Sequence, residues 1–492
     1  MRARMFAPEN RKWWTLVAVS FGLFMIMLDN TVVNVALPSI RSDLGISVSE
    51  LEWVVNAYAL TFGVLLLTGG KLADLLGRRA IFIAGLIIFS GASLWCGLAG
   101  GAASLIAART VQGAGAALMN PATLSIITAT FPARLRGTAI GIWAGVSALA
   151  LAIGPLVGGV ITERISWSWI FFVNVPVGVV GVLAARAFID ETKDTSREQR
   201  LDLPGLVSSA VGLFALTYGL IETNTHPWGS TRVVGLLALA AVSLTAFVLL
   251  EARQRIPMLD LSLFRNPSFS GANTVMGMVG LSMFGIFFFN SLFLQNVLGY
   301  SAIKTGATFL PMTLLIILVA PFAGRLSDRI GPRWPIVSGM TLLTGSLLLF
   351  GRLDAQSSFS DILPGLLVGG FGIAITMAPT TAAAMGSVPV DKAGVGSAVI
   401  NSMRQVGGSL GIAIMGTVVA THLTVGAASP AYDAQFVAGY HRALQVGAAI
   451  LFAGAVVAAV TIGRARRPQP AAVEAAVPET ALTATPSFEK VA

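Results

Sequence analysis

Two charged residues stand inside stretches that are otherwise almost wholly apolar. Asp29 lies in the segment 13–38, and Arg109 lies in the segment 104–128. A charge at such a place costs about 2.5–3.5 kcal/mol when the segment enters a bilayer, so it needs a partner or a task. Burial favours the neutral form of a carboxyl group and a nearby guanidinium favours the charged form, which suits a group that gains and loses protons. The alternative is a static structural ion pair.

The composition places these residues in a membrane. Hydrophobic residues make up 55% of the 492 residues. Charged residues make up 11%, against roughly 25% in soluble domains. These fractions argue against a soluble enzyme, a nucleic-acid-binding domain and a disordered scaffold, so no nucleic acid is expected as a partner despite the net charge of +9. The single cysteine, Cys96, excludes an intramolecular disulfide and a multi-cysteine metal site.

Apolar segments of about the length that a spanning helix needs, roughly 20 residues, recur along the whole chain. The fourteen candidates are 13–38, 51–70, 80–100, 104–128, 138–162, 167–188, 203–222, 233–251, 269–293, 303–324, 335–352, 361–384, 395–421 and 442–463. With a cytoplasmic N-terminus, 24 Lys and Arg residues fall on inner segments, 6 fall on outer segments, and Arg109 and Arg404 fall within spans. This asymmetry predicts an even number of spans and both termini in the cytoplasm. The protein is expected in the plasma membrane.

A motif of ten residues occurs twice, 254 positions apart. Gly70–Arg79 (GKLADLLGRR) follows the second span and recurs after the tenth span as Gly324–Arg333 (GRLSDRIGPR). One copy is explained by a basic inner turn that anchors the topology, whereas two copies at equivalent places favour repeated halves. Repeated halves with a site between them at mid-depth are typical of secondary transporters. Two six-helix bundles with two inserted central helices are therefore expected.

This interpretation divides the chain into five parts. They are a cytoplasmic N-terminus (1–12), an N-terminal bundle (13–188), two linker helices with flanking cytoplasmic loops (189–268), a C-terminal bundle (269–463) and a disordered cytoplasmic tail (464–492). A secretory signal peptide is not expected at the N-terminus, because the first apolar stretch runs on through Asp29 and no clear cleavage site follows it.

Five segments together resemble signatures of the major facilitator superfamily, and more closely those of its fourteen-span drug:proton antiporter family. They are Leu28–Pro38, Gly70–Arg79, Arg109–Gly115, Gly154–Gly159 and Trp167–Pro176. The resemblance extends from Arg11 to about Arg467. The sequence departs from that pattern at Ala150, where a glycine is usual, and at Ser168, where an arginine is common.

The resemblance implies an all-α polytopic protein with the major facilitator fold, which exports drugs or other hydrophobic compounds in exchange for protons by alternating access. It assigns proton coupling to Asp29 and Arg109. The implied gating loops contain Gly70, Asp74, Gly77, Arg78, Arg79, Asp328 and Arg333, and the implied antiporter motif contains Gly154, Pro155, Gly158 and Gly159.

The inner loop also has a physical interpretation of its own. Asp74 can accept hydrogen bonds from a helix N-terminus or from an arginine across the bundle, and such a contact can latch the inner ends together and release them. Gly70 and Gly77 are expected to allow the turn. The small residues Ala150, Gly154 and Gly158 have the spacing that lets two helices pack closely.

Polar residues inside spans are the candidates for contact with a substrate. They are Asn34, Asn56, Gln112, Asn290 and Arg404. Hydrogen bonds between helices explain most of them equally well. Arg404 differs because a second cation inside the membrane can meet an anionic substrate or a cluster of carbonyl groups. Whether Arg404, or Glu222 near an outer end, contacts substrate stays open at this point.

Other classes of membrane protein fit the sequence less well. A nucleotide-driven pump is disfavoured because no phosphate-binding Gly-x-x-x-x-Gly-Lys-Ser/Thr motif occurs. An enzyme or a metal site is not expected, since His226, His422 and His441 have no metal-ligand spacing. The expected partners are a small organic substrate, protons and lipid. No cofactor is expected, and the chain is expected to be a monomer. The main alternative is a proton-coupled importer or exporter of an endogenous metabolite, antibiotic or lipid.

Overall fold

A computed structural model describes most of the chain as long helices. The described residues are 10–46, 48–193, 202–223, 226–254, 257, 259–422 and 431–463. The predicted disordered tail at 464–492 and most of the predicted N-terminal segment at 1–12 lie outside these residues.

The first six apolar segments form a consecutive set of helices, of which α2 is the longest at 34 residues. Their bounds are α2 (Arg11–Leu44), α3 (Val48–Leu76), α4 (Arg78–Gly97), α5 (Ala102–Thr130), α6 (Ala133–Arg164), α7 (Trp169–Phe172) and α8 (Asn174–Phe188). The segment predicted at 167–188 as one span is interrupted at Val173 and therefore forms both α7 and α8.

The remaining segments form the central pair of helices and a second consecutive set. Their bounds are α9 (Leu203–Glu222), α10 (Thr231–Arg253), η2 (Leu261–Arg265), α11 (Pro267–Leu292), η3 (Phe293–Val297), α12 (Ala302–Thr308), α13 (Leu310–Ile330), α14 (Arg333–Phe350), α15 (Phe359–Gly386), η4 (Val390–Lys392), α16 (Ala393–Ala420) and α17 (Tyr432–Thr461). The span predicted at 303–324 is interrupted at Phe309. Pro311 lies in the first turn of α13, where its missing N–H group is not needed.

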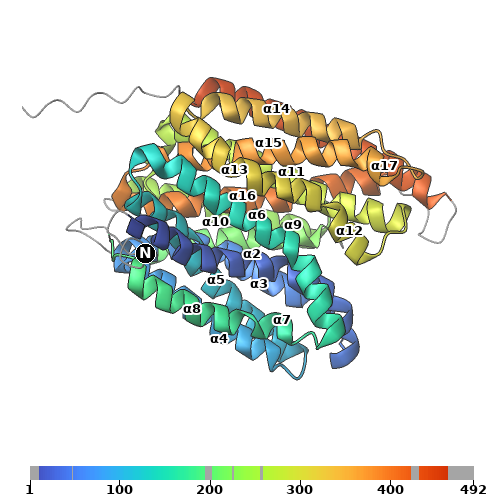
Figure 1. The fold of residues 1–492 in the computed structure, drawn as a ribbon, viewed down its shortest axis with the longest axis horizontal. Coiled ribbons are helices and arrows are strands. Elements are labelled where there is room, and N and C mark those ends of the chain that lie inside the picture. Colours follow the sequence, from blue (N-terminus) through green and yellow to red (C-terminus); the bar gives the residue numbers. More distant parts are fainter. Residues whose placement is uncertain are drawn as a thin grey trace, which may run out of the picture.

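The helices pack as two groups that meet along two seams. Helices α2 to α8 lie mainly against one another, and so do α11 to α17, as Figure 1 shows. At one seam α3 packs against α16, and at the other α6 packs against α13. These two seams therefore flank any site between the two groups.

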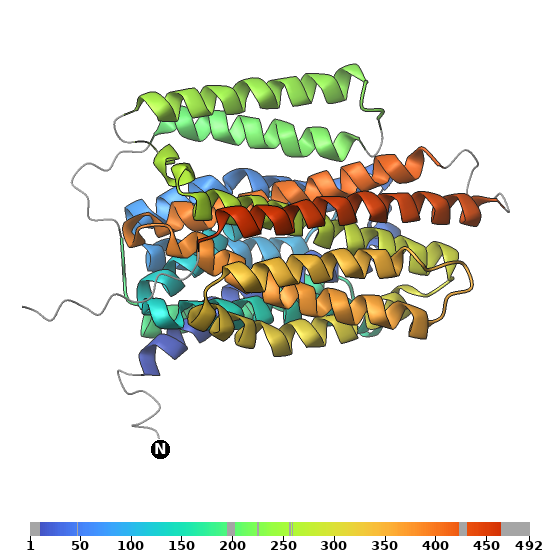
Figure 2. The same ribbon diagram turned by 90° about the horizontal axis from the view of Figure 1, so that it is seen from above.

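Helices α9 and α10 form a separate pair at one edge of the molecule (Figure 2). They pack against each other, and α9 also contacts both α3 and α16, so the pair lies over one seam and not over the other. The side chain of Trp228, in the connection between them, donates a hydrogen bond to Thr417 of α16.

The segment that follows α10 is tied to the start of α16 by an ion pair. Lys392 Nζ lies 2.8 Å from Asp260 Oδ2. Partial burial acts to raise the pKa of Asp260, but the hydrogen bonds from Lys392 and Ser262 outweigh it and lower the pKa to about 2. The carboxylate thus stays ionised at neutral pH, and the ion pair would be lost only on strong acidification.

Twelve helical stretches of the described chain are long and apolar enough to cross a membrane. Helices α5 and α6, with 29 and 32 residues, are not among them. The fourteen spans predicted from sequence are therefore confirmed only in part. Helix α5 carries the buried polar residues Arg109, Gln112 and Asn120, which lower its mean hydropathy.

Candidate functional site

Asp29 and Arg109 contact each other. Arg109 Nη1 of α5 lies 2.6 Å from Asp29 Oδ2 of α2. Arg109 is 1% exposed and Asp29 is 3% exposed, so the pair is removed from both water and lipid. In such a place each charge stabilises the other, and removal of one partner alone leaves an uncompensated charge.

Gln112 joins this ion pair to two further helices. Its Nε2 donates to Asp29 Oδ1 at 2.9 Å and to Ser93 Oγ of α4 at 2.7 Å. Its Oε1 accepts a hydrogen bond from Arg109 Nη1 at 2.7 Å. Ser93 Oγ also accepts a hydrogen bond from Asn174 of α8 at 3.3 Å. The sequence singled out Gln112 as a possible substrate contact, whereas the structure places it inside the ion-pair network.

Arg109 has contacts that do not involve Asp29. Its Nε donates to the Val54 carbonyl of α3 at 3.1 Å, and its guanidinium carbon lies 4.2 Å from the centre of the Tyr58 ring. A cation over an aromatic face is favoured electrostatically, most strongly away from water. The guanidinium therefore keeps a carbonyl, an amide and a ring as neighbours when the carboxyl group of Asp29 is neutral.

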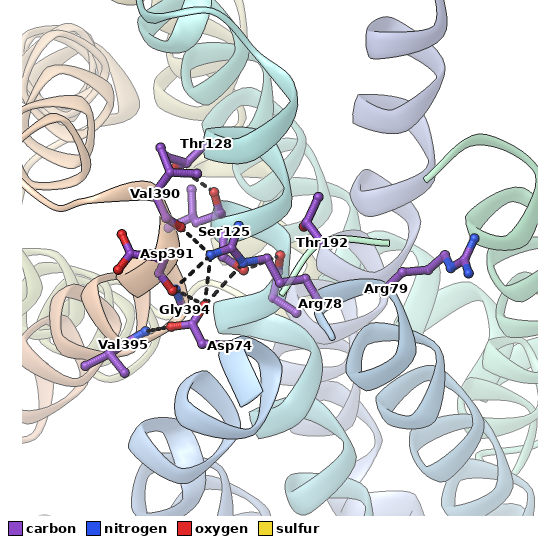
Figure 3. A network of polar contacts seen from close by, with 12 residues as sticks. Asp74, Arg78, Arg79, Ser125, Thr128, Thr192, Val390, Asp391, Gly394 and Val395 are labelled. Atoms are coloured by element: carbon purple, nitrogen blue, oxygen red, sulfur yellow. Dashed lines mark hydrogen bonds and ion pairs between the residues drawn. The ribbon is translucent and has the colours of Figure 1, made fainter. Parts of the chain in front are cut away.

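At one end of the molecule, Asp74 of α3 caps the start of α16 across the first seam (Figure 3). Its two carboxylate oxygens accept hydrogen bonds from the backbone N–H groups of Gly394 at 2.9 Å and Val395 at 3.0 Å. Arg78 lies 3.0 Å from the same carboxylate and also donates to the Val390 carbonyl. Free N–H groups in a first helical turn attract a negative charge, so this Asp74 latch joins the two groups of helices.

The two glycines of this motif have different roles. Gly77 has a φ of 113° and forms the turn between α3 and α4. Gly70 lies within α3, so the expectation that it allows the turn is wrong. A Cβ atom at Gly70 would lie 2.5 Å from the Gly394 carbonyl oxygen, and glycine there permits the close approach of α3 and α16. Arg79 points away from the latch, and its Nε lies 3.7 Å from Glu191 (Figure 3).

The second copy of the motif forms an equivalent contact at the other seam. Asp328 of α13 accepts hydrogen bonds from Gly137 N–H, Thr138 N–H and the Thr138 hydroxyl near the start of α6, each at 3.1 Å. In the part of the chain that the structure describes, no cation lies within ion-pair distance of Asp328. Pro332 occupies the position that corresponds to Arg78 in the first copy.

Arg333 does not join this Asp328 latch. It begins α14, and its guanidinium carbon lies 5.5 Å from the centre of the Trp334 ring. The two latches are thus alike in their acid and backbone donors, but only the Asp74 latch contains an arginine.

The glycines of the predicted antiporter motif face α2 next to Asp29. A Cβ atom at Gly154 would collide with the Thr31 hydroxyl, and one at Gly158 would lie 3.0 Å from the Val32 carbonyl oxygen. Pro155 lies between them within α6, and a Cβ at Gly159 would come no closer than 3.8 Å to Ile303. These small residues set the separation of α2 and α6 within one turn of Asp29.

The predicted substrate residues do not converge on one site. Asn290 accepts a hydrogen bond from the Tyr440 hydroxyl, and Asn56 is half-buried on α3. The side chain of Asn34 is outside the description, although its backbone is within α2. Arg404 of α16 lines a central cavity of about 10 Å³. This volume holds about one water molecule, so an organic compound would require the cavity to open.

Comparison with known proteins identifies the family. The sequence pattern of the Major Facilitator Superfamily matches residues 19–412. The chain belongs to the Major Facilitator Superfamily. Membership makes this superfamily protein a multi-pass membrane transporter and not an enzyme, and it confirms the resemblance seen in the sequence motifs.

Named relatives and a solved structure share most of its length. The tetracenomycin C resistance and export protein of Streptomyces glaucescens is 36% identical over 415 residues, which are 84% of this chain and 77% of that protein. The puromycin resistance protein pur8 of Streptomyces alboniger is 38% identical over 466 residues, which are 92% of each chain. The crystal structure of the human organic anion transporter MFSD10 (TETRAN) covers 92% of this chain and 99% of that chain, with a TM-score of 0.65 and 14% identity. The last likeness shows a shared fold.

The difference between the latches of this superfamily protein predicts unequal effects of neutralising their acids. Asp74→Asn is expected to raise the maleimide-labelling rate of a cysteine placed at Ser397, a buried residue one turn beyond Gly394, by roughly tenfold or more. Hydrogen bonds to a charged group contribute about 1.5–3 kcal/mol each, and Asp74 has both backbone and arginine donors. Asp328→Asn should give a smaller rise, and the exposed Asp433→Asn should give none. Equal rates for the two latch variants would contradict this account.

Tight packing at the α2–α6 contact predicts a loss of stability when a side chain is added there. Gly154→Val should lower the unfolding temperature of the purified protein by roughly a few degrees, because overpacking of a close contact typically costs about 1–3 kcal/mol. Leu156→Val is the matched control, since Leu156 is 55% exposed on the same helix. An unchanged unfolding temperature in Gly154→Val would show that α2 and α6 are not in close contact.

Proposed function

We propose that this transporter exports drugs or other hydrophobic organic compounds in exchange for protons, by alternating access. The buried contact between Asp29 and Arg109 is the observation that carries the proposal. One relative is named for resistance to tetracenomycin C and its export, and another is named for resistance to puromycin, which supports outward movement of antibiotic-like compounds.

Asp29 is the proposed proton-binding group. When it is ionised, it holds α2 to α5 through Arg109 and Gln112. When it binds a proton, its attraction to Arg109 falls, while Arg109 retains the Val54 carbonyl and the Tyr58 ring. Protonation of Asp29 thus weakens the contact between α2 and α5, while the guanidinium of Arg109 keeps other partners. A purely structural ion pair would not require these additional partners.

A continuous set of contacts runs from Asp29 to the Asp328 latch. Helix α2 packs closely on α6 through Gly154 and Gly158, and α6 presents Gly137 and Thr138 to Asp328 of α13. A change in the position of α2 therefore acts on the helix that carries the donors of the latch. In the proposed cycle both latches close the inner end while the opposite end opens, and their release allows the reverse.

The proposed topology has fourteen spans, with both termini in the cytoplasm and the chain in the plasma membrane as a monomer. Helices α5 and α6 are included because 29 and 32 residues, at about 1.5 Å per residue, exceed a hydrocarbon core of about 30 Å. The division into bundles at 13–188 and 269–463, with the linker 189–268, is part of the same proposal. The excess of Lys and Arg on the inner segments supports this orientation.

Loss of the titratable group should uncouple transport from protons. Asp29→Asn keeps the size and most hydrogen bonds of the side chain but cannot exchange a proton at physiological pH. In inverted vesicles with an acidified lumen, wild type should release protons when some members of a panel of anionic, neutral and cationic lipophilic compounds are added, and Asp29→Asn should release less than about a tenth as much. Dequenching of a pH-sensitive dye measures this release.

The exposed Asp433→Asn serves as the control and should behave as wild type. The amount of each variant in the membrane is measured by immunoblot, so that loss of protein is not mistaken for loss of coupling. Full proton release by Asp29→Asn would refute its role. If labelled nutrients entered intact cells that carry the protein, and no drug caused proton release, the protein would be an importer and the proposal of export would be wrong.

A further inference from the structure

Arg404 is a buried cation without an acidic partner. It is 8% exposed and lies eleven residues from the start of α16, roughly 17 Å along the helix and near mid-depth of the membrane. Its guanidinium donates to Asn401 Oδ1 at 3.1 Å, and no carboxylate within the described ranges lies within 4.0 Å of it. The other two buried arginines, Arg78 and Arg109, each pair with an aspartate.

The cavity beside Arg404 lies where the two groups of helices meet. Residues of α5 and α6 line it from one group, and residues of α11, α15 and α16 line it from the other. The lining residues are Leu124, Trp143, Met276, Thr381, Ile400, Asn401 and Arg404. Movement of one group relative to the other would therefore change the volume of the space that the guanidinium faces.

Three buried polar atoms, each one turn along a helix from a lining residue, have no hydrogen-bond partner among the described residues. Both amide atoms of Asn120 are unpaired at 0% exposure, one turn before the lining residue Leu124 on α5. The hydroxyl of Ser397 is also unpaired, one turn before Asn401 on α16. Buried polar groups are nearly always hydrogen-bonded, so unpaired ones that flank a cavity mark a place where a ligand or water binds.

We propose that Arg404 is the anion-binding group of a central substrate site, and that the exported compounds carry an ionised carboxylate or phenolate on an aromatic or apolar body. A guanidinium binds a carboxylate through two parallel hydrogen bonds, which a neutral side chain cannot match. Trp143, Met276 and Leu124 supply apolar surface beside it. This inference rests on the proposed export function, because it names the substrate class of that transport.

An unpaired buried cation lowers stability, which is consistent with a group retained for binding. Without ligand, the shape-related Arg404→Met should therefore unfold at the same temperature as wild type or at a higher one. A cationic compound would be repelled at this position, whereas an anionic one would neutralise the guanidinium when it binds.

Two xanthene dyes of similar shape and opposite charge test the proposal, namely fluorescein and rhodamine 6G. Fluorescence anisotropy with purified protein in detergent measures their binding. Wild type should bind fluorescein more tightly than rhodamine 6G. Arg404→Gln should weaken fluorescein binding at least tenfold without weakening that of rhodamine 6G, and Arg404→Lys should fall between. The exposed Arg352→Gln is the matched control and should not change either affinity.

The outcomes separate this site from the proposed antiport. Equal fluorescein affinity in wild type and Arg404→Gln, or a wild type that prefers rhodamine 6G, would overturn the anion site. Arg404-dependent binding of fluorescein in a protein that releases no protons with any compound would support the site and refute antiport. Thermal unfolding of each variant shows whether it is folded. If Arg404→Gln does not fold, the fluorescein affinity of Arg404→Lys still decides whether Arg404 binds the anion.

Discussion

A charge inside a bilayer must be neutralised or solvated by the protein, and the contact of Asp29 with Arg109 is where this requirement is strongest here. Both side chains are almost completely buried, and their separation is 2.6 Å. Gln112 donates to Asp29 and to Ser93, and the Val54 carbonyl accepts from Arg109, which draws α2, α3, α4 and α5 together around one point. The packing of the first group of helices therefore depends on this buried ion pair and its amide partner.

The same need to satisfy polar groups explains the two latches. Helix ends leave backbone N–H groups without partners, and Asp74 supplies acceptors for those of Gly394 and Val395 from across a seam. At the other seam Asp328 accepts hydrogen bonds from the N–H groups of Gly137 and Thr138, which lie in the second turn of α6. Because each latch joins the two groups of helices, both latches would have to break and form again in the proposed alternating-access cycle. Of the two latches, only the Asp74 latch also contains an arginine in the described structure.

Sequence patterns predicted the parts of this structure that depend on side-chain chemistry and periodicity. The depth of Asp29 and Arg109, the repeated motif and the apolar segments all follow from the order of residues along the chain. The sequence predicted that Asp74 can accept hydrogen bonds from a helix N-terminus, but not which helix supplies them, because the N–H groups of Gly394 and Val395 have no signature in a side chain. For this reason Gly70 was assigned to a turn, although it permits a close helix approach. The interruption of the helix at Val173 was also not predicted, because the residue at that position is neither a proline nor a glycine.

The central claim is that Asp29 changes its protonation state within the membrane. Infrared difference spectroscopy of the protein in lipid, between neutral and acidic pH, observes the carbonyl band of a protonated carboxylic acid directly. The account predicts a carbonyl band in wild type from a carboxylic acid that is shielded from exchange with bulk water. This band should be missing from the spectrum of Asp29→Asn. A spectrum in which every protonated acid is solvent-exposed, with no contribution from residue 29, would show that the Asp29–Arg109 pair is only structural.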